Sequence, residues 1–351
     1  MPERLVDRHP QLGAEELVAR FVPPHRFEKV RFESYVPNPA FPSQQQSLVA
    51  MERFAADLCE DASPRARRWW RRDGPAEAPG LMGRYLDGGY GVGKTHLLAA
   101  LWHAVPPPAV YLTFAELTAV IGFVGMGEAI EAFSGYRLLC IDEFELDDVA
   151  NTLMTVSFLR GLLPPRRSGT QPAGTRVATT SNSLPDRLGE GRFHADDFRR
   201  EITAIADHFE VLRIDGPDYR GRSGVVVDPL DDDDLDRMVA TTTGASTMDS
   251  LDELLPHLRR VHTVQFAAML DGLEAVFIRG LHPIRNQGDA LLFVHLVDEL
   301  YDAGLSFAAS GCPVGELFPA SYRHGGYRKK YGRCESRLSA MLGEAVSPSR
   351  D

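Results

Sequence analysis

Short apolar stretches alternate with amphipathic ones along the first part of this 351-residue chain. The apolar stretches are rich in Leu, Val, Ile and Tyr, as buried β-strands are. The amphipathic stretches predict helices, and strands that alternate with helices form a parallel sheet covered on both faces. We therefore expect an α/β fold with five strands, at residues 81–87, 109–114, 136–143, 176–182 and 209–215. The expected helices lie at residues 43–58, 96–103, 116–133, 149–163 and 196–208, and Gly122, Gly125 and Gly127 break the one at 116–133.

The pattern changes beyond residue 217. An acidic run at residues 228–236 predicts a solvated loop, and Ser250 and Glu253 stand in capping-box register at the start of a further helix. Two more strands are expected at residues 275–278 and 305–310, with a helix at 290–301 between them and a basic helical tail at 327–342. We divide the chain into an N-terminal adaptor segment packed on the next domain (1–40), a five-stranded core (41–224) and a C-terminal α/β extension (225–351).

Composition and charge argue against several classes of protein. The formal net charge is −11, whereas non-specific nucleic-acid binding needs a basic face. No apolar run is long enough to cross a membrane, and the polar N-terminus lacks the core of a signal peptide. The four cysteines are far apart and form no C-x-x-C pair, which favours reduced thiols over disulfides or a zinc site. We therefore expect a cytoplasmic protein.

The Arg- and Trp-rich segment at residues 65–72 leaves two interpretations open. Basic and aromatic residues that alternate in this way can stack on bases and contact phosphates. A solvated linker whose tryptophans dock locally explains the segment equally well.

Residues 88–95 match the phosphate-binding pattern G-x-x-x-x-G-K-[ST]. The segment follows a predicted strand and precedes a predicted helix, so backbone N–H groups and a helix N-terminus point at a polyphosphate. Glycines let the backbone curl around the phosphate, Lys94 supplies a cation to the β- and γ-phosphates, and the Thr95 hydroxyl is expected to ligate Mg²⁺. The expected ATP contacts are Gly88, Gly89, Tyr90, Gly91, Val92, Gly93, Lys94, Thr95 and His96.

Two acids follow the third predicted strand. Asp142 and Glu143 come directly after the apolar residues 138–141, so their carboxylates are expected at the carboxyl edge of the sheet. Asp142 is expected to position Mg²⁺ together with Thr95, and Glu143 to orient and deprotonate the attacking water. Asn182 ends the fourth strand and is expected to hold the same water or a γ-phosphate oxygen. Paired acids at this place favour the ATPase (ASCE) branch of P-loop NTPases over simple nucleotide kinases.

Three stretches, at residues 139–150, 178–188 and 296–302, carry a resemblance to a known family. They resemble the AFG-like AAA+ ATPases. Arg333 and Arg337 belong to a segment that is similar, though less closely, to that family's Arg-Thr-x-Ser-Arg-Leu motif. The resemblance implies an ATP-hydrolysing homo-oligomer with a core of the AAA+ type that handles a protein partner. It also implies a role in cell division, in which the tubulin-like division ring is a candidate client.

The chain departs from the family pattern where a catalytic arginine is expected. The family arginine that follows the asparagine of the fourth strand falls on Ala195 here. A ring ATPase usually takes such a cation from a neighbouring subunit. We expect Arg192, in a predicted loop, to serve in preference to Arg200, with Arg199 third. The phosphate loop also differs, because family members usually carry G-G-V-G-x-G-K-T.

Two other functions are weighed against this one. Residues 95–98 and 111–117 are similar to those of replication initiators and helicase loaders, but the acidic balance argues against DNA binding. A nucleotide-gated scaffold that hardly hydrolyses is disfavoured by the intact Asp142–Glu143 pair. The sequence leaves open whether Arg333 or Arg337 contacts the nucleotide.

Overall fold

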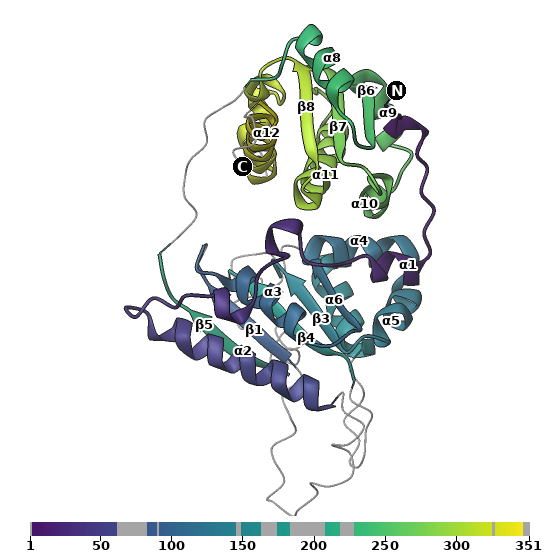
Figure 1. Ribbon diagram of the computed structural model, residues 1–351. Helices are drawn as coiled ribbons and strands as arrows, with labels where there is room; N and C mark the ends of the chain where they lie inside the picture. The colour runs from purple at the N-terminus through teal and green to yellow at the C-terminus, as the bar shows by residue number, and fades with distance from the viewer. Residues whose placement is uncertain are drawn as a thin grey trace, which may run out of the picture. The chain divides into compact units, whose positions relative to one another are not determined.

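The computed structural model describes residues 2–61, 83–89, 91–144, 149–162, 174–182, 208–217, 228–324 and 327–346. Contacts divide the chain into two compact units, which we name by their sheets (Figure 1). The five-stranded unit comprises Gly13–Pro23 and Phe27–Arg220. The three-stranded unit comprises Met1–Leu12, Pro24–Arg26 and Gly221–Asp351. The domain boundaries that we expected at residues 40 and 224 stay a prediction. The two units observed here interleave along the chain.

The five-stranded unit contains the parallel sheet that the sequence predicts. Its strand order is β2-β3-β4-β1-β5, and every pairing is parallel. Because β4 lies between β1 and β3, the carboxyl ends of these three strands meet at one edge of the sheet. The strands are β1 Gly83–Gly88, β2 Ala109–Thr113, β3 Leu138–Asp142, β4 Arg176–Ser181 and β5 Phe209–Ile214. All five strand predictions are confirmed.

Helices α2 and α3 share one core cluster with the sheet. Met51 and Leu58 of α2 are buried together with Leu97 of α3 and Leu86 of β1. Burying each such side chain contributes roughly 1.5–3 kcal/mol, which fixes α3 against the strand that precedes it. The helices of this unit are α1 Ala14–Ala19, α2 Pro42–Asp61, α3 Lys94–Ala104, α4 Phe114–Val124, α5 Met126–Ser134 and α6 Val149–Leu162, with a 3₁₀ turn η3 at Phe32–Ser34. The helix predicted at residues 196–208 lies outside the described residues.

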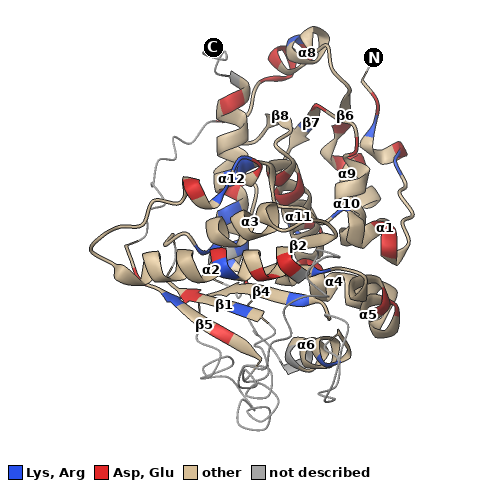
Figure 2. Ribbon diagram, turned by 60° about the horizontal axis from the view of Figure 1, so that its bottom comes forward, with Lys and Arg blue, Asp and Glu red and all other residues tan. Residues whose placement is uncertain are grey.

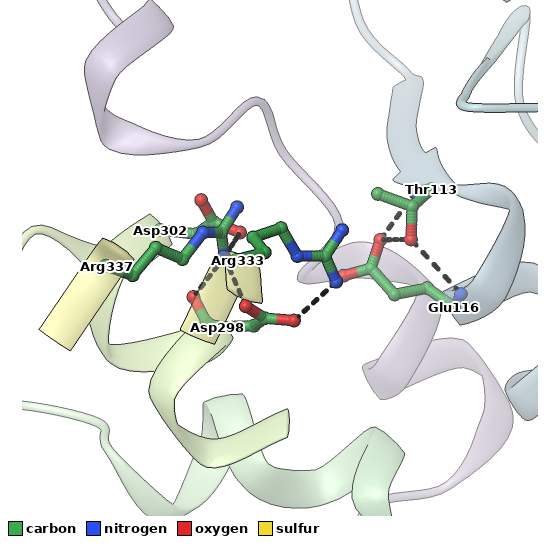
Figure 3. A network of polar contacts seen from close by, with 6 residues as sticks. All are labelled: Thr113, Glu116, Asp298, Asp302, Arg333 and Arg337. Carbon is green, nitrogen blue, oxygen red and sulfur yellow. Dashed lines mark hydrogen bonds and ion pairs between the residues drawn. The ribbon is translucent and has the colours of Figure 1, made fainter. Parts of the chain in front are cut away.

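The helix predicted at residues 116–133 is two helices. The break falls at Gly125, whose φ of 89° and ψ of 158° suit only glycine. Gly122 and Gly127 lie inside α4 and α5 and break neither helix. A capping box begins α4: Thr113 Oγ1 accepts a hydrogen bond from the Glu116 N–H at 3.2 Å, and Glu116 Oε2 accepts one from the Thr113 N–H at 2.5 Å (Figure 3).

The three-stranded unit is a second parallel sheet, in the order β6-β7-β8. Strands β7 Ala275–Leu281 and β8 Ser306–Gly311 confirm two predictions, whereas β6 Ser246–Ser250 was not predicted because its sequence has no apolar run. The Ser250 hydroxyl accepts a hydrogen bond from the Glu253 N–H at 3.3 Å, so the predicted helix start is confirmed. The helices are α8 Asp232–Thr241, α9 Leu251–Leu258, α10 Phe266–Met269, α11 Gln287–Ala303 and α12 Arg328–Val346, with 3₁₀ turns η1 Leu5–Asp7, η6 Thr263–Gln265, η7 Val314–Glu316 and η8 Ala320–His324.

The acidic run at residues 228–236 is not a loop, as we had predicted, but contains the start of a helix. Asp231 is the N-cap of α8, and its side chain accepts a hydrogen bond from the Asp234 N–H at 2.7 Å. Acids in a first helical turn are stabilised by the helix dipole, and they gather at the start of α8 (red in Figure 2). Leu235 is fully buried and ties the helix to its unit. Our prediction of a loop rested on the charge of this segment and did not take the buried Leu235 into account.

The first 40 residues divide between the two units. Glu3 pairs with Thr247 of β6 as an isolated parallel bridge, and Leu5 is fully buried in the core of the three-stranded unit. In the five-stranded unit, the carbonyl oxygen of Phe21 accepts a hydrogen bond from the Tyr111 N–H at 3.0 Å, at the outer edge of β2. The segment thus contributes to both units, rather than packing only on the domain that follows it.

Two further observations concern the whole of the described chain. All four cysteines are free thiols, as the sequence predicts. Among the described residues, no helix combines the length and the apolar character that crossing a membrane requires.

Candidate active site

The predicted phosphate loop connects β1 to α3. Gly91 and Gly93 have φ angles of 71° and 95°, in the left-handed region that glycine tolerates. A Cβ atom on Gly88 would lie 2.3 Å from the carbonyl oxygen of Ile214, so this position also needs glycine. Two left-handed residues just before a helix N-terminus turn backbone N–H groups inward and form an anion-binding concavity. Tyr90 lies outside the described residues.

Lys94 is held at this loop by three acceptors. Its Nζ donates hydrogen bonds to the carbonyl oxygens of Gly88 and Gly89, at 2.9 and 2.6 Å, and to Asn182 Oδ1 at 2.9 Å. The side chain is buried, so its charge acts in a medium of low dielectric constant. The carboxyl end of β4 therefore lies next to the loop that follows β1. Lys94 and Asn182 are in contact, as the sequence predicts.

The Asp142 carboxylate lies at the same edge of the sheet. It is buried and accepts hydrogen bonds from Thr95 Oγ1 at 3.2 Å, from the Tyr111 hydroxyl at 3.0 Å and from the Thr180 hydroxyl. Thr95 and Asp142 thus offer a hydroxyl and a carboxylate oxygen side by side, a hard donor set of the kind that Mg²⁺ prefers. Among the described residues, no three or more His, Cys, Asp and Glu side chains are grouped so that they could hold a metal ion by themselves. One carboxylate and one hydroxyl beside a phosphate loop fit a magnesium site that substrate phosphates complete.

Glu143 adopts an unusual backbone conformation. Its φ of 53° is the only positive value of a non-glycine residue among those described, and such a conformation costs of order 1–3 kcal/mol. The Glu143 N–H donates to Thr180 Oγ1 at 3.0 Å and to Asp142 Oδ1 at 3.1 Å, and the Phe144 N–H donates to the Thr180 carbonyl oxygen at 2.7 Å. These contacts hold the turn that follows β3, and with it the position of the exposed Glu143 side chain.

Thr180 and Tyr111 are site residues that the sequence analysis missed. Both lie within predicted strands, and only their contacts with Asp142 distinguish them from other strand residues. The sequence feature that could have identified them is a hydroxyl side chain near the carboxyl end of a buried strand that is next to the strand carrying Asp142. Thr180 lies two residues before Asn182, on the strand that pairs with β3.

The His96 side chain contacts Ser34 and Tyr35. Its Nε2 lies 2.9 Å from the Ser34 hydroxyl, and its ring packs edge-on against Tyr35 with 5.5 Å between the ring centroids. Burial lowers the pKa of His96, so the imidazole is neutral at pH 7. If His96 contacts a phosphate, as we predict, it does so through its backbone N–H in the first turn of α3.

A buried carboxyl group precedes the loop. Burial raises the pKa of Asp87, and the neighbouring charges of Arg213 and Lys94 oppose this rise. Asp87 is paired in register with Arg213 of β5. The sequence analysis missed Asp87 because a single acid at the end of a strand has no pattern of its own.

The candidate arginines fall into two groups. Arg192, Arg199 and Arg200 lie outside the described residues, as does the Arg- and Trp-rich segment at residues 65–72. Arg333 and Arg337 of α12 bind Asp298 of α11 through their guanidinium groups, at 2.7 and 2.8 Å, and Arg337 also reaches Asp302 at 3.3 Å (Figure 3). Only 13% of the Arg337 side chain is exposed, so this ion-pair network is an internal part of the three-stranded unit.

Two solved structures have a low overall similarity to this chain. A DnaI crystal structure has a TM-score of 0.42 and 18% identity, and covers 59% of this chain and 99% of its own. A replication initiator DnaA bound to AMPPCP and single-stranded DNA has a TM-score of 0.38 and 13% identity, and covers 54% of this chain and 51% of its own.

Comparison with related sequences identifies the family of this chain. The cell division protein ZapE of Escherichia coli K12 is 25% identical over 86% of this chain and 91% of its own length. An uncharacterized protein of Schizosaccharomyces pombe is 26% identical over 45% of this chain and 38% of its own. A family model described as AFG1-like ATPase matches residues 18–227 and 228–347, which include both units. With a phosphate loop, a paired Asp-Glu and a polar strand tip assembled at one sheet edge, the chain belongs to the AFG1-like ATPase family.

Proposed function

We propose that this ATPase couples Mg²⁺-dependent ATP hydrolysis to the remodelling of a protein partner in cell division. The observation that carries the proposal is the meeting of Lys94 with Asn182 and of Thr95 with Asp142, at one edge of the sheet. The relative from Escherichia coli, named as a cell division protein and matched along 86% of this chain, supports the cellular role.

Each residue of the site has a proposed step. The loop amides and Lys94 bind the β- and γ-phosphates. Thr95 and Asp142 would hold Mg²⁺, which would supply positive charge beside the phosphates. Glu143 orients the attacking water and takes its proton, while Asn182 fixes the same water or a γ-oxygen. Thr180 supports this geometry, because it binds both the Asp142 carboxylate and the Glu143 N–H.

The proposed active form is a homo-oligomer in which Arg192 of one subunit reaches the γ-phosphate bound to the next, with Arg200 as the second candidate. Arg192→Ala should leave ATP affinity nearly intact and reduce turnover by ~10³-fold, the usual contribution of such an arginine. Mixing it with Lys94→Ala should restore some activity, because each variant supplies the group that the other lacks. Turnover that does not depend on protein concentration, with no rescue on mixing, would contradict the oligomer.

The partner is proposed to be the tubulin-like division protein in its polymerised form. Glu143→Gln, loaded with ATP, should co-sediment with purified polymers of that protein, whereas Lys94→Ala under the same conditions should not. Remodelling predicts that the wild-type chain with ATP, but not Glu143→Gln, shortens or dissolves the polymers. Retention on a replicative helicase or on single-stranded DNA instead would contradict the proposal and favour a helicase loader.

A further inference from the structure

The phosphate loop is supported from behind by the segment that contains η3. Phe32 and Tyr35 are buried in the same core cluster as Val92 and Leu97. The Tyr35 hydroxyl donates a hydrogen bond to the carbonyl oxygen of Val92 at 3.2 Å, and both atoms are buried. This side chain therefore contacts the loop backbone itself.

The direction of one peptide group follows from this contact. A trans peptide is planar, and its C=O and N–H point in opposite directions. Because the Val92 carbonyl is turned toward Tyr35, the N–H of Gly93 is turned away from Tyr35 and into the concavity of the loop. If this peptide rotated, the loop would lose the hydrogen bond to Tyr35 and one of its inward-pointing donors.

The Tyr35 ring also fixes the residue at position 93. A Cβ atom on Gly93 would lie 2.5 Å from Tyr35 Cε2, well inside van der Waals contact. Gly93 has a φ of 95°, which already disfavours any other residue. This position therefore needs glycine for two reasons, and only the left-handed φ can be read from the motif.

Ser34 and His96 hold the ring in place. The Ser34 hydroxyl donates to the Arg31 carbonyl oxygen at 2.6 Å, so it has no second proton to offer His96 Nε2 at 2.9 Å. Nε2 must therefore carry the proton and donate it to Ser34. The His96 ring then packs edge-on against Tyr35, which links the first turn of α3 to the side chain behind the loop.

We propose that Tyr35 is a positioning residue for nucleotide binding, which orients the Val92–Gly93 peptide of the phosphate loop. Its hydroxyl does not act in the chemical step, so its loss should weaken the binding of substrate and transition state equally. The inference depends on ATP binding at this loop and is independent of the partner on which the ATPase acts.

The test compares two Tyr→Phe variants by calorimetry with ADP and with a non-hydrolysable ATP analogue. Tyr35→Phe should raise both dissociation constants and KM by about 3- to 10-fold, the scale of one net hydrogen bond, with kcat within about twofold of wild type. Tyr322→Phe is the matched control, because its hydroxyl also donates to a backbone carbonyl, that of Arg285 at 2.7 Å, in the other unit. Unchanged affinity in Tyr35→Phe, or an equal loss in both variants, would overturn the proposal.

A double-mutant cycle tests the part played by the ring. Gly93→Ala should weaken ADP binding less in a Tyr35→Ala background than in the wild-type chain, because the new methyl group then meets no ring. An equal loss in the two backgrounds would show that only the φ of Gly93 matters, and would remove Tyr35 from the positioning of the loop.

Discussion

The carboxylates of the two units have different partners. In the five-stranded unit, Asp142 is held by the hydroxyls of Thr95, Tyr111 and Thr180, and it has no ion-pair partner within the described part of the chain. In the three-stranded unit, two acids of α11 form ion pairs with arginines. Arg259 binds Asp289 with two hydrogen bonds of 2.6 and 2.5 Å, and Arg333 and Arg337 bind Asp298.

The difference separates the candidate site from a structural ion-pair network. The charge of a carboxylate bound to a guanidinium is already compensated, and transferring that carboxylate to a metal would leave the guanidinium without its partner. A carboxylate held by neutral hydroxyls keeps its full negative charge, so a divalent cation can bind it without breaking an ion pair. Both sheets are parallel, but their strand orders differ, and Asp142 of the five-stranded sheet is held by hydroxyl groups rather than by an arginine.

The largest expected effect is the loss of the loop cation. Lys94→Ala should abolish nucleotide binding, because the loop loses the ammonium group that serves the β- and γ-phosphates. The matched control is Lys330→Ala in the other unit, where the ammonium group lies over the Tyr327 ring at 5.6 Å. Calorimetry with ATP should show no binding for the first variant and wild-type affinity for the second. Wild-type affinity in both would contradict the assignment of the phosphate loop.

Removing the proposed base should slow the reaction without releasing the nucleotide. Glu143→Gln is expected to bind ATP and to turn it over at least ~100-fold more slowly, because the amide keeps the shape but accepts no proton. Glu116→Gln is the control, since a glutamine serves a capping box as well as a glutamate does. Steady-state hydrolysis within a few-fold of wild type for Glu143→Gln would mean that another group activates the water.

The ion-pair network on α11 predicts an effect on stability rather than on catalysis. Arg337→Ala leaves Asp298 and Asp302 facing each other without their shared partner, and should lower the free energy of unfolding by about 2–3 kcal/mol. Arg333→Ala, at an ion pair with 41% of the arginine side chain exposed, should cost at most about 1 kcal/mol. Urea denaturation measures both. A loss of ADP affinity of tenfold or more in Arg337→Ala would instead identify it as a nucleotide contact.

The smallest expected effect is on pH dependence. Burial lowers the pKa of His257, whose Nε2 lies 3.1 Å from the Arg8 carbonyl oxygen, so folding favours the neutral imidazole. Its contribution to stability is present above the unfolded pKa of about 6.5 and is lost as the pH falls below it. His257→Gln should therefore reduce the drop in melting temperature between pH 7.5 and 5.5 by about 1–2 °C. The exposed His324→Gln should leave that drop unchanged, and an equal change in both would contradict the assignment.

The sequence by itself determined the five-stranded fold, the phosphate loop and the acids beside it. These features are local: apolar runs predict strands, glycines at fixed spacing predict a loop that curls around a phosphate, and Asp142 follows a buried strand directly. A local pattern also predicted the capped start of α9 at Ser250. The same reasoning failed for α8, because the acidic run obscured a helix whose one buried residue, Leu235, has an effect only in the folded unit.

The tertiary structure alone decided which side chains support the site. Thr180 meets Asp142 because β4 pairs with β3, and Tyr35 meets the loop because η3 packs against α3. Leu5 enters the core of the three-stranded unit from the opposite end of the chain. Each of these contacts joins residues that are distant in sequence, so no periodicity or motif records them. The local backbone conformation of a residue can be predicted from its neighbours in the sequence. The partner of a buried hydroxyl, in contrast, depends on how the strands and helices assemble.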